Sequence, residues 1–218
     1  MSERRFYFAG LPDSGAVALS PDIVHHVAVL RLSAGAKIVL FDGAGKRADA
    51  TLLDATHARI DRFEQTPPRA PLLLAVPLLK GDRQDWLVEK LCELGVSTLQ
   101  PIVTERAVIR ELSDNKRARM ERLVVAACKQ CGRADLMRIA PLADVASVRD
   151  ATVLSPGAAV ALAELSPSVL VVGPEGGLTD AEEVALVAAG GTRARLVGPI
   201  LRAETAAIAA AAIALART

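Results

Sequence analysis

Two glycine-anchored turns near the C-terminus decide the fold: Gly173-Pro-Glu-Gly-Gly177, after the apolar run 169–172, and Gly198-Pro-Ile-Leu-Arg-Ala-Glu-Thr205, after Leu196 and Val197. Each turn predicts a strand that stops in a loop and restarts as a helix. In open α/β sheets, this geometry brings backbone groups to a ligand at the carboxyl ends of the strands. The two turns together predict an α/β fold with a small-molecule site.

Neither turn has the spacing of the common nucleotide-binding loops, G-x-G-x-x-G or G-x-x-x-x-G-K-[ST]. Thr179-Asp-Ala-Glu182 forms a capping box. Its acidic residues complement the helix dipole and would repel a phosphate. The pattern therefore favours a cofactor with a cationic centre. A glycine after a buried strand also occurs in a plain tight turn, so a single turn would leave both interpretations open.

Further segments, in order along the chain, match the pattern of one family. They are Arg5-Phe6, Phe41-Asp42-Gly43, Lys80-Gly81, Glu89-Lys90-Leu-x-Glu93-Leu-Gly-Val96, Pro101 with Glu105-Arg106, Ala127-x-x-Gln130-x-x-Arg133, and Gly198-x-Ile-Leu-Arg202-x-Glu204-Thr205-Ala206. With them, nearly the whole chain resembles the bacterial 16S ribosomal RNA (uracil-N3)-methyltransferases of the SPOUT superfamily.

The resemblance implies two domains. Residues 72–218 would form the SPOUT methyltransferase domain, an α/β fold with a deep trefoil knot, and residues 1–68 would form a PUA-like β-barrel domain that binds RNA. The pattern of the residues agrees, because short strand-like segments precede a proline-rich break at 66–71 and strands alternate with helices after it. Such alternation predicts a parallel sheet covered on both faces. The family also implies a homodimer with the site at the interface.

The periodicity predicts the individual elements. Strands are expected at residues 5–9, 37–41, 47–53, 57–63, 72–78, 99–103, 158–163, 169–172 and 194–197, and helices at 21–30, 82–94 and 116–132, from 180 and from 204. The apolar face expected for the helix at 82–94 is Trp86, Leu87, Val88, Leu91 and Leu94.

The family's cofactor is S-adenosylmethionine, which the resemblance places in a pocket made by three loops. The implied cofactor-binding residues are Leu162, Ala163, Gly173, Pro174, Glu175, Gly176, Gly177, Leu196, Gly198, Ile200 and Leu201. We expect Arg202 to be catalytic by stabilising the anion that forms on uracil. Glu204, also expected to be catalytic, and Glu175 would accept the proton or orient Arg202. Alternatively, Glu204 only caps the last helix.

Positive charge is concentrated in one segment, although the net charge is only +1. Residues 106–133 contain eight lysines or arginines and three acidic residues, which either attract a polyanion or form a solvated helix face. The expected RNA-binding residues are Arg5, Arg106, Arg117, Arg119, Arg122 and Arg133, with Arg133 reaching either the RNA or a neighbouring subunit's site. Aromatic residues make up 3% of the chain, so we expect phosphate contacts rather than base stacking.

No metal site is expected. Cys128 and Cys131 could suggest zinc or redox chemistry, but a second ligand pair at suitable spacing is missing and the histidines lie far upstream. At i and i+3 on a helix, the two cysteines instead suit core packing. No apolar run approaches a membrane span, and Met-Ser-Glu-Arg-Arg is not the start of a signal peptide. We expect a cytoplasmic protein whose partner is 16S ribosomal RNA in the small subunit.

Two other classes of function stay open at this point. One is a non-catalytic RNA-binding or ribosome-assembly factor on the knotted fold, which would not need the intact glycine turn and Arg202. The other is a flavin- or nucleotide-dependent metabolic enzyme on an open α/β sheet, which lacks a supporting phosphate motif.

Overall fold

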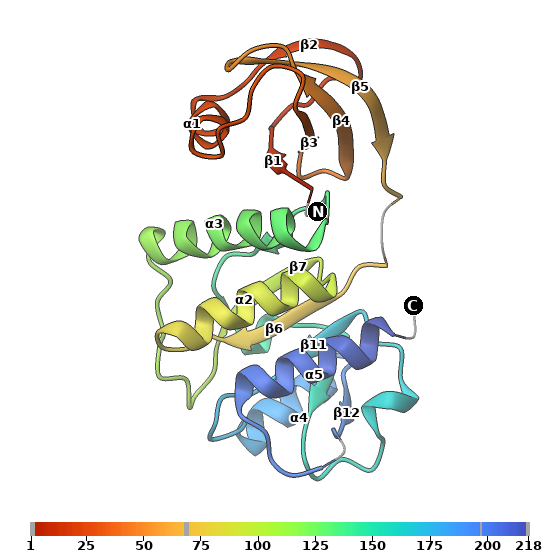
Figure 1. Ribbon diagram of the computed structural model, residues 1–218. Helices are drawn as coiled ribbons and strands as arrows, with labels where there is room; N and C mark the ends of the chain where they lie inside the picture. The colour runs from red at the N-terminus through yellow and green to blue at the C-terminus, as the bar shows by residue number, and fades with distance from the viewer. Residues whose placement is uncertain (1–2, 68–69, 197, 217–218) are drawn as a thin grey trace. The chain divides into compact units, whose positions relative to one another are not determined.

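The computed structural model describes residues 3–67, 70–196 and 198–216, and Figure 1 shows its elements. Pro68, the last residue of the predicted first domain, and Val197, the last residue of a predicted strand, lie outside the described residues. The chain divides into two compact units. The first joins Met1–Arg69 to Val125–Leu136, and the second joins Ala70–Val124 to Met137–Thr218.

The first unit is built on a five-stranded sheet in the order β1-β3-β4-β5-β2. Its strands are β1 (Arg5–Tyr7), β2 (Gly15–Ala18), β3 (Lys37–Phe41), β4 (Lys46–Leu52) and β5 (His57–Gln65). β1 pairs with β3 in parallel, and the other pairs are antiparallel. Four of these strands were predicted. β2 was missed because its sequence Gly-Ala-Val-Ala contains a single large apolar residue.

Alternating burial along β4 defines the core of this unit. Ala48, Ala50 and Leu52 are buried and their neighbours are half-exposed, as expected for a strand with one face on a core. Helix α1 (Pro21–Val29) adds Ile23 and Val27 to the same core, because residues four apart share one face of a helix.

The chain that follows helix α3 (Asp114–Cys131) is tied to the β3–β4 hairpin of the first unit. The backbone nitrogen of Leu136 donates to the Gly43 carbonyl oxygen at 2.9 Å. Gly43 has a φ of +80°, and a Cβ there would lie 2.8 Å from the Leu136 side chain. The hairpin therefore requires glycine at this position.

The second unit contains a parallel sheet in the order β12-β10-β11-β6-β7-β8, with β9 also paired to β7. The strands are β6 (Leu73–Pro77), β7 (Thr98–Val103), β8 (Arg138–Ile139), β9 (Ala143–Asp144), β10 (Thr152–Leu154), β11 (Val169–Val171) and β12 (Thr192–Ala194). In β6, the consecutive residues Leu74, Ala75 and Val76 are all buried. The sheet is therefore covered on both faces, which confirms the predicted α/β fold class.

The helices of the second unit follow its strands along the chain. They are α2 (Asp82–Leu94), the start of α3, α4 (Asp180–Ala188) and α5 (Ala203–Leu215), with single 3-10 turns at Val145–Ser147 and Leu162–Glu164. α2 packs against α5, and α5 packs on β6. α2 ends at Gly95, whose φ of 103° gives the left-handed C-cap that glycine adopts readily. The trefoil knot implied by the resemblance stays a prediction.

The structure corrects three of the predictions for this unit. The strand expected at 158–163 is a loop with a 3-10 turn, and the strand lies earlier, at β10, because Thr152-Val-Leu has the β-branched composition that the alanine-rich segment lacks. β12 ends at Ala194, before most of the predicted strand at 194–197. Trp86 was predicted to be in the core of α2, but 45% of it is exposed.

The exposed Trp86 and the buried Leu87 provide a matched test of the packing of α2. We expect Leu87→Ala to lower the free energy of unfolding by about 2–5 kcal/mol, because Leu87 is fully buried and its loss leaves a cavity. Trp86→Ala, one residue earlier on the same helix, should cost much less. Urea unfolding followed by circular dichroism measures both. Equal losses would show that α2 does not pack as described.

Candidate active site

Three loops meet at one edge of the parallel sheet of the second unit. β12, β10 and β11 are neighbours and run parallel, so their carboxyl ends lie together. The loops that follow them, residues 195–202, 155–163 and 172–178, contain every residue that the sequence predicted for cofactor binding. In open α/β sheets, ligands bind at this edge.

Two of these loops pair along their backbones. The Arg195 nitrogen donates to the Val160 carbonyl at 2.9 Å, and the Leu162 nitrogen donates to the Arg195 carbonyl, also at 2.9 Å. The Arg195 guanidinium adds a bond to the Ala158 carbonyl at 3.2 Å. Leu162 and Leu196, predicted to bind the cofactor from segments far apart in sequence, therefore lie on adjacent backbones.

The glycine turn after β11 needs its glycines for different reasons. The Gly177 nitrogen donates to the Pro174 carbonyl at 2.8 Å, which closes a tight turn with Gly177 at a φ of +71°. Gly173 is confined by packing, because a Cβ there would lie 3.0 Å from the Leu178 nitrogen. Glu175 and Gly176, at the tip of the turn, are exposed.

The segment after β7 holds this turn from the side. The Arg106 guanidinium donates to the Gly176 carbonyl and, at 3.5 Å, to the Leu178 carbonyl. The backbone nitrogen of Glu105 donates to Oε1 of Glu182 at 2.7 Å. Arg106, predicted as an RNA contact, thus has a structural role at the turn that its sequence pattern did not indicate.

Glu182 also forms the predicted capping box of α4. Its carboxylate accepts from the Thr179 nitrogen at 2.8 Å, and the Thr179 hydroxyl accepts from the Glu182 nitrogen at 3.2 Å. This fixes where α4 begins and hence where the glycine turn ends. The first turn of α4 contains three acidic residues, Asp180, Glu182 and Glu183. Negative charge therefore borders the sheet edge where the three loops meet.

One guanidinium connects three separate parts of the site. Arg83, in the first turn of α2, donates from Nε to Oε1 of Glu204 at 2.9 Å and from Nη2 to both Glu204 and Glu175. It thereby joins the start of α2 to the glycine turn and to the start of α5. Sequence reasoning missed Arg83, because nothing in the spacing of an arginine at 83 indicates a partner 121 residues later.

The Arg83 guanidinium sets the charge of both carboxylates. Its hydrogen bonds hold the pKa of Glu204 below the ordinary value, against the opposing effect of burial, and nearby Arg202 adds to the lowering. Arg83 likewise lowers the pKa of Glu175, and the two carboxylates raise the pKa of Arg83. All three groups are therefore charged at neutral pH, and as carboxylates with lowered pKa Glu204 and Glu175 are weak bases.

Arg202 occupies the N-cap position of α5, and its carbonyl accepts from the Ala206 nitrogen at 2.8 Å. It is exposed, and among the described residues its guanidinium makes no hydrogen bond or ion pair. Gly198 is also exposed, and Ile200 is 86% exposed. The loop before α5 thus presents a cation and an apolar side chain that are open to ligands.

Most of the arginines predicted to bind RNA are committed to contacts within the protein. In the first unit, Arg5 and Arg133 are buried; Arg5 donates to the Gly132 carbonyl at 2.7 Å, and Arg133 pairs with Asp135 at 2.7 Å.

In the second unit, Arg117 donates to the Ile139 and Ala140 carbonyls, and Arg119 pairs with Asp85. Arg122 is exposed and has no side-chain partner among the described residues. Of the six predicted RNA contacts, Arg122 is therefore the most available to a phosphate.

The cysteines follow their prediction only in part. Cys128 is buried, as predicted, but Cys131 is exposed, because the helix ends there and its last turn leaves the core. Within the part of the chain that the structure describes, no group of three histidine, cysteine or acidic side chains could hold a metal ion. No helix among those residues is long and apolar enough to cross a membrane.

The sequence matches the models of two domain families. Residues 66–215 match the RNA methyltransferase domain, and residues 19–61 match the RNA methyltransferase PUA domain. The chain therefore belongs to the RNA methyltransferase family and carries its PUA domain.

Two similar proteins are the ribosomal RNA small subunit methyltransferases E of Mycobacterium bovis and Synechocystis. The first is 32% identical, over 94% of this chain and 88% of the relative. The second is 34% identical, over 87% of this chain and 69% of the relative.

Two solved structures are similar over almost the whole chain. Ribosomal RNA small subunit methyltransferase E from Neisseria gonorrhoeae, bound to S-adenosylmethionine, has 34% identity and a TM-score of 0.85, covering 96% of this chain and 95% of that one. A Legionella pneumophila protein in complex with the same cofactor has 26% identity and a TM-score of 0.84, covering 100% and 98%.

The bridge between Arg83 and Glu204 predicts a measurable coupling. In a double-mutant cycle with Arg83→Met and Glu204→Gln, we expect an interaction free energy of about 0.5–3 kcal/mol, in the lower part of that range because one side of Arg83 is open to solvent. The same cycle on the more exposed pair Arg119 and Asp85 is the control, and its coupling should be smaller.

The coupling should also depend on pH. Because the folded pKa of Glu204 lies below its ordinary value of 4.5, the stabilisation is present above that value and is lost as the pH falls through the lowered pKa. Thermal unfolding at a series of pH values measures this. A coupling that is the same at pH 7 and at pH 3 would contradict the charge assignment.

Proposed function

We propose that this protein transfers a methyl group from S-adenosylmethionine to N3 of a specific uridine in the 16S ribosomal RNA of the small subunit. The observation that supports it most is the meeting of three loops at one sheet edge, one of which ends at the exposed Arg202. The names of the similar proteins from Mycobacterium and Synechocystis support ribosomal RNA of the small subunit as the substrate.

The sheet edge where the three loops meet suits a cofactor with a cationic centre. At Gly198, with a φ of +111°, there is open space where a side chain would stand. Charged Glu175 and the acidic first turn of α4 favour a cation over a phosphate. The residues proposed to hold S-adenosylmethionine are Leu162, Ala163, Gly173, Pro174, Glu175, Gly176, Gly177, Leu196, Gly198, Ile200 and Leu201. The cofactor-bound Neisseria and Legionella structures support this choice of cofactor.

In the proposed mechanism, Arg202 acts on the uracil. When bound, S-adenosylmethionine supplies an electrophilic methyl group on a sulfonium sulfur. The N3 of uracil must lose its proton, and the resulting negative charge spreads to the neighbouring carbonyl oxygens. A guanidinium aimed at one of those oxygens stabilises the charge as it develops. This makes N3 more acidic, so that a weak base such as the exposed Glu175 carboxylate can accept the proton.

Glu204 acts in this mechanism mainly through other residues. It is buried, charged and shared with Arg83, which makes it a poor acceptor for an imide proton. We propose that Glu204 is a positioning residue that fixes the start of α5, and with it the backbone of Arg202. Glu175, exposed at the tip of the glycine turn, is the better placed carboxylate for contact with a ligand.

The two predicted domains divide the work in this proposal. Residues 1–68 bind RNA and residues 72–218 carry the reaction, with Arg122 as a phosphate contact of the second. We also propose a cytoplasmic homodimer, because the substrate is a ribosomal subunit and the exposed Ile200 loop would gain cover from a second copy. Without cofactor binding, the chain would instead be a non-catalytic assembly factor.

The glycine turn can be tested against a glycine with the same backbone angle. Gly177→Val should abolish binding of S-adenosylmethionine, because a side chain would fill the ligand's space. Gly10 has the same φ of +71° and open space around it, so Gly10→Val carries similar backbone strain outside the site. Calorimetry with both folded variants measures the affinities. Unchanged affinity in Gly177→Val would remove this turn from the cofactor site.

Arg202 should affect the rate more than cofactor affinity. Arg202→Ala should lower the single-turnover rate by roughly 10²–10³-fold, by analogy with the loss of an oxyanion-hole donor. Arg202→Lys should recover part of it, since it keeps the charge but loses the planar fork. The assay is methylation of small ribosomal subunits with saturating cofactor. A normal rate in the alanine variant would move the catalytic role elsewhere.

A further inference from the structure

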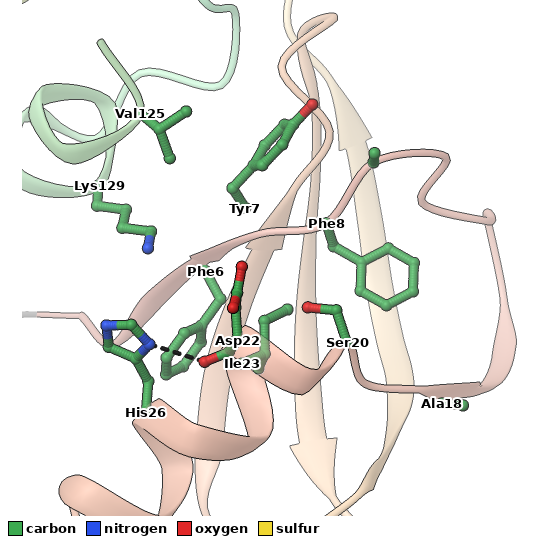
Figure 2. Close-up of a pocket in the computed structure, with 11 residues that line it drawn as sticks. Phe6, Tyr7, Phe8, Ala18, Ser20, Asp22, Ile23, His26, Val125 and Lys129 are labelled. Carbon is green, nitrogen blue, oxygen red and sulfur yellow. Dashed lines mark hydrogen bonds between the residues drawn. The ribbon is translucent and has the colours of Figure 1, made fainter. Parts of the chain in front are cut away.

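The first unit carries a second candidate binding site, which the proposed reaction does not use. It is a pocket of about 370 Å³ between β1, the start of α1 and the end of α3 (Figure 2). Its volume falls within the range of about 300–1,000 Å³ in which small ligands bind.

Aromatic residues form part of the pocket wall. Although the chain has only six aromatic residues, three of them, Phe6, Tyr7 and Phe8, are consecutive and all line this pocket. Phe6 is buried in the core beneath it, and the Tyr7 ring packs on Phe41 with 5.8 Å between centroids. The low aromatic content therefore does not exclude base stacking, because the half-buried Tyr7 and Phe8 both line this pocket.

Three polar side chains line the same pocket. Figure 2 shows the Asp22 carboxylate, the Ser20 hydroxyl and the Lys129 ammonium group extending toward its interior. Within the described residues, none of the three side chains has a hydrogen bond or ion pair, and Asp22 and Lys129 do not pair with each other. Ser20, at the N-cap of α1, makes no side-chain cap. A carboxylate and an ammonium group are thus both available to one ligand.

One side of the pocket is fixed in place. Nδ1 of His26 lies 2.7 Å from the Asp22 carbonyl oxygen, and because a carbonyl only accepts, Nδ1 carries the hydrogen. The His26 ring also meets the edge of Phe6 at 6.5 Å between centroids. The backbone that carries Asp22 is therefore held by α1 and by its own histidine.

We propose that this pocket binds one unstacked guanine base of the RNA, an inference that rests on the proposed RNA substrate. Guanine presents two adjacent N–H donors, on N1 and N2, next to the acceptor O6. The Asp22 carboxylate accepts the two donors, Lys129 donates to O6, and the ring stacks on the aromatic wall. Uracil places its N–H between two carbonyls that the carboxylate repels, and adenine and cytosine offer an amino donor beside a ring acceptor.

The test uses the full-length chain and short single-stranded RNA. The probes are a heptamer of uridine and three heptamers with one central guanosine, adenosine or cytidine, measured by fluorescence anisotropy at one salt concentration. The guanosine heptamer should bind about 5- to 100-fold more tightly than the others. Asp22→Asn should remove that preference. Glu111→Gln, which removes an exposed carboxylate outside the pocket, should keep it.

Equal affinities of the wild-type chain for all four heptamers, or a guanosine preference that survives in folded Asp22→Asn, would overturn the proposal. The methylation assay and cofactor calorimetry are run in parallel to separate it from the proposed function. Normal methylation without a guanosine preference would contradict the guanine-binding pocket and leave the proposed reaction intact. If the chain has no methylation activity but shows a guanosine preference that depends on Asp22, only the proposed reaction is contradicted.

Discussion

The site depends on the parallel pairing of β12, β10 and β11. Parallel strands all end at one edge of the sheet, so the loops after them meet although they are separated by tens of residues along the chain. The pairing of Arg195 with Val160 and Leu162 extends this arrangement beyond the last strand residue. The sheet thus brings the backbone groups of the three loops together at its edge, and the loops need little regular structure of their own.

Arg83 supplies the second constraint, which acts between side chains. The glycines allow the turn after β11 to be tight, but they also give its backbone many possible conformations. Contacts from other residues must therefore fix the turn in one conformation. Arg83 holds it through Glu175, and Arg106 holds it through the Gly176 carbonyl. The Arg83 guanidinium also keeps the buried Glu204 charged at the start of α5, where an unpaired carboxylate would be costly.

The sequence predicted most of what depends on local pattern. Helix α2, the capping box at Thr179 and the two glycine turns all follow from spacing and residue type within a few positions. The strand order and the Arg83 bridge depend on pairs far apart in the chain, which no local pattern specifies. The misplaced strand at 158–163 has a different cause, since alanine and valine in a short apolar run suit several structures.

The six arginines predicted to contact RNA stay a prediction, but they differ in a physical respect that charge counting omits. Arg5 and Arg133 are basic, but both are buried, and they already donate to the Gly132 carbonyl and to Asp135. Arg122 and Lys129 on α3 and Arg202 before α5, by contrast, have no hydrogen bond or ion pair from their side chains to any residue that the structure describes. Availability, rather than the number of charges, therefore decides which side chains can meet a phosphate or a base.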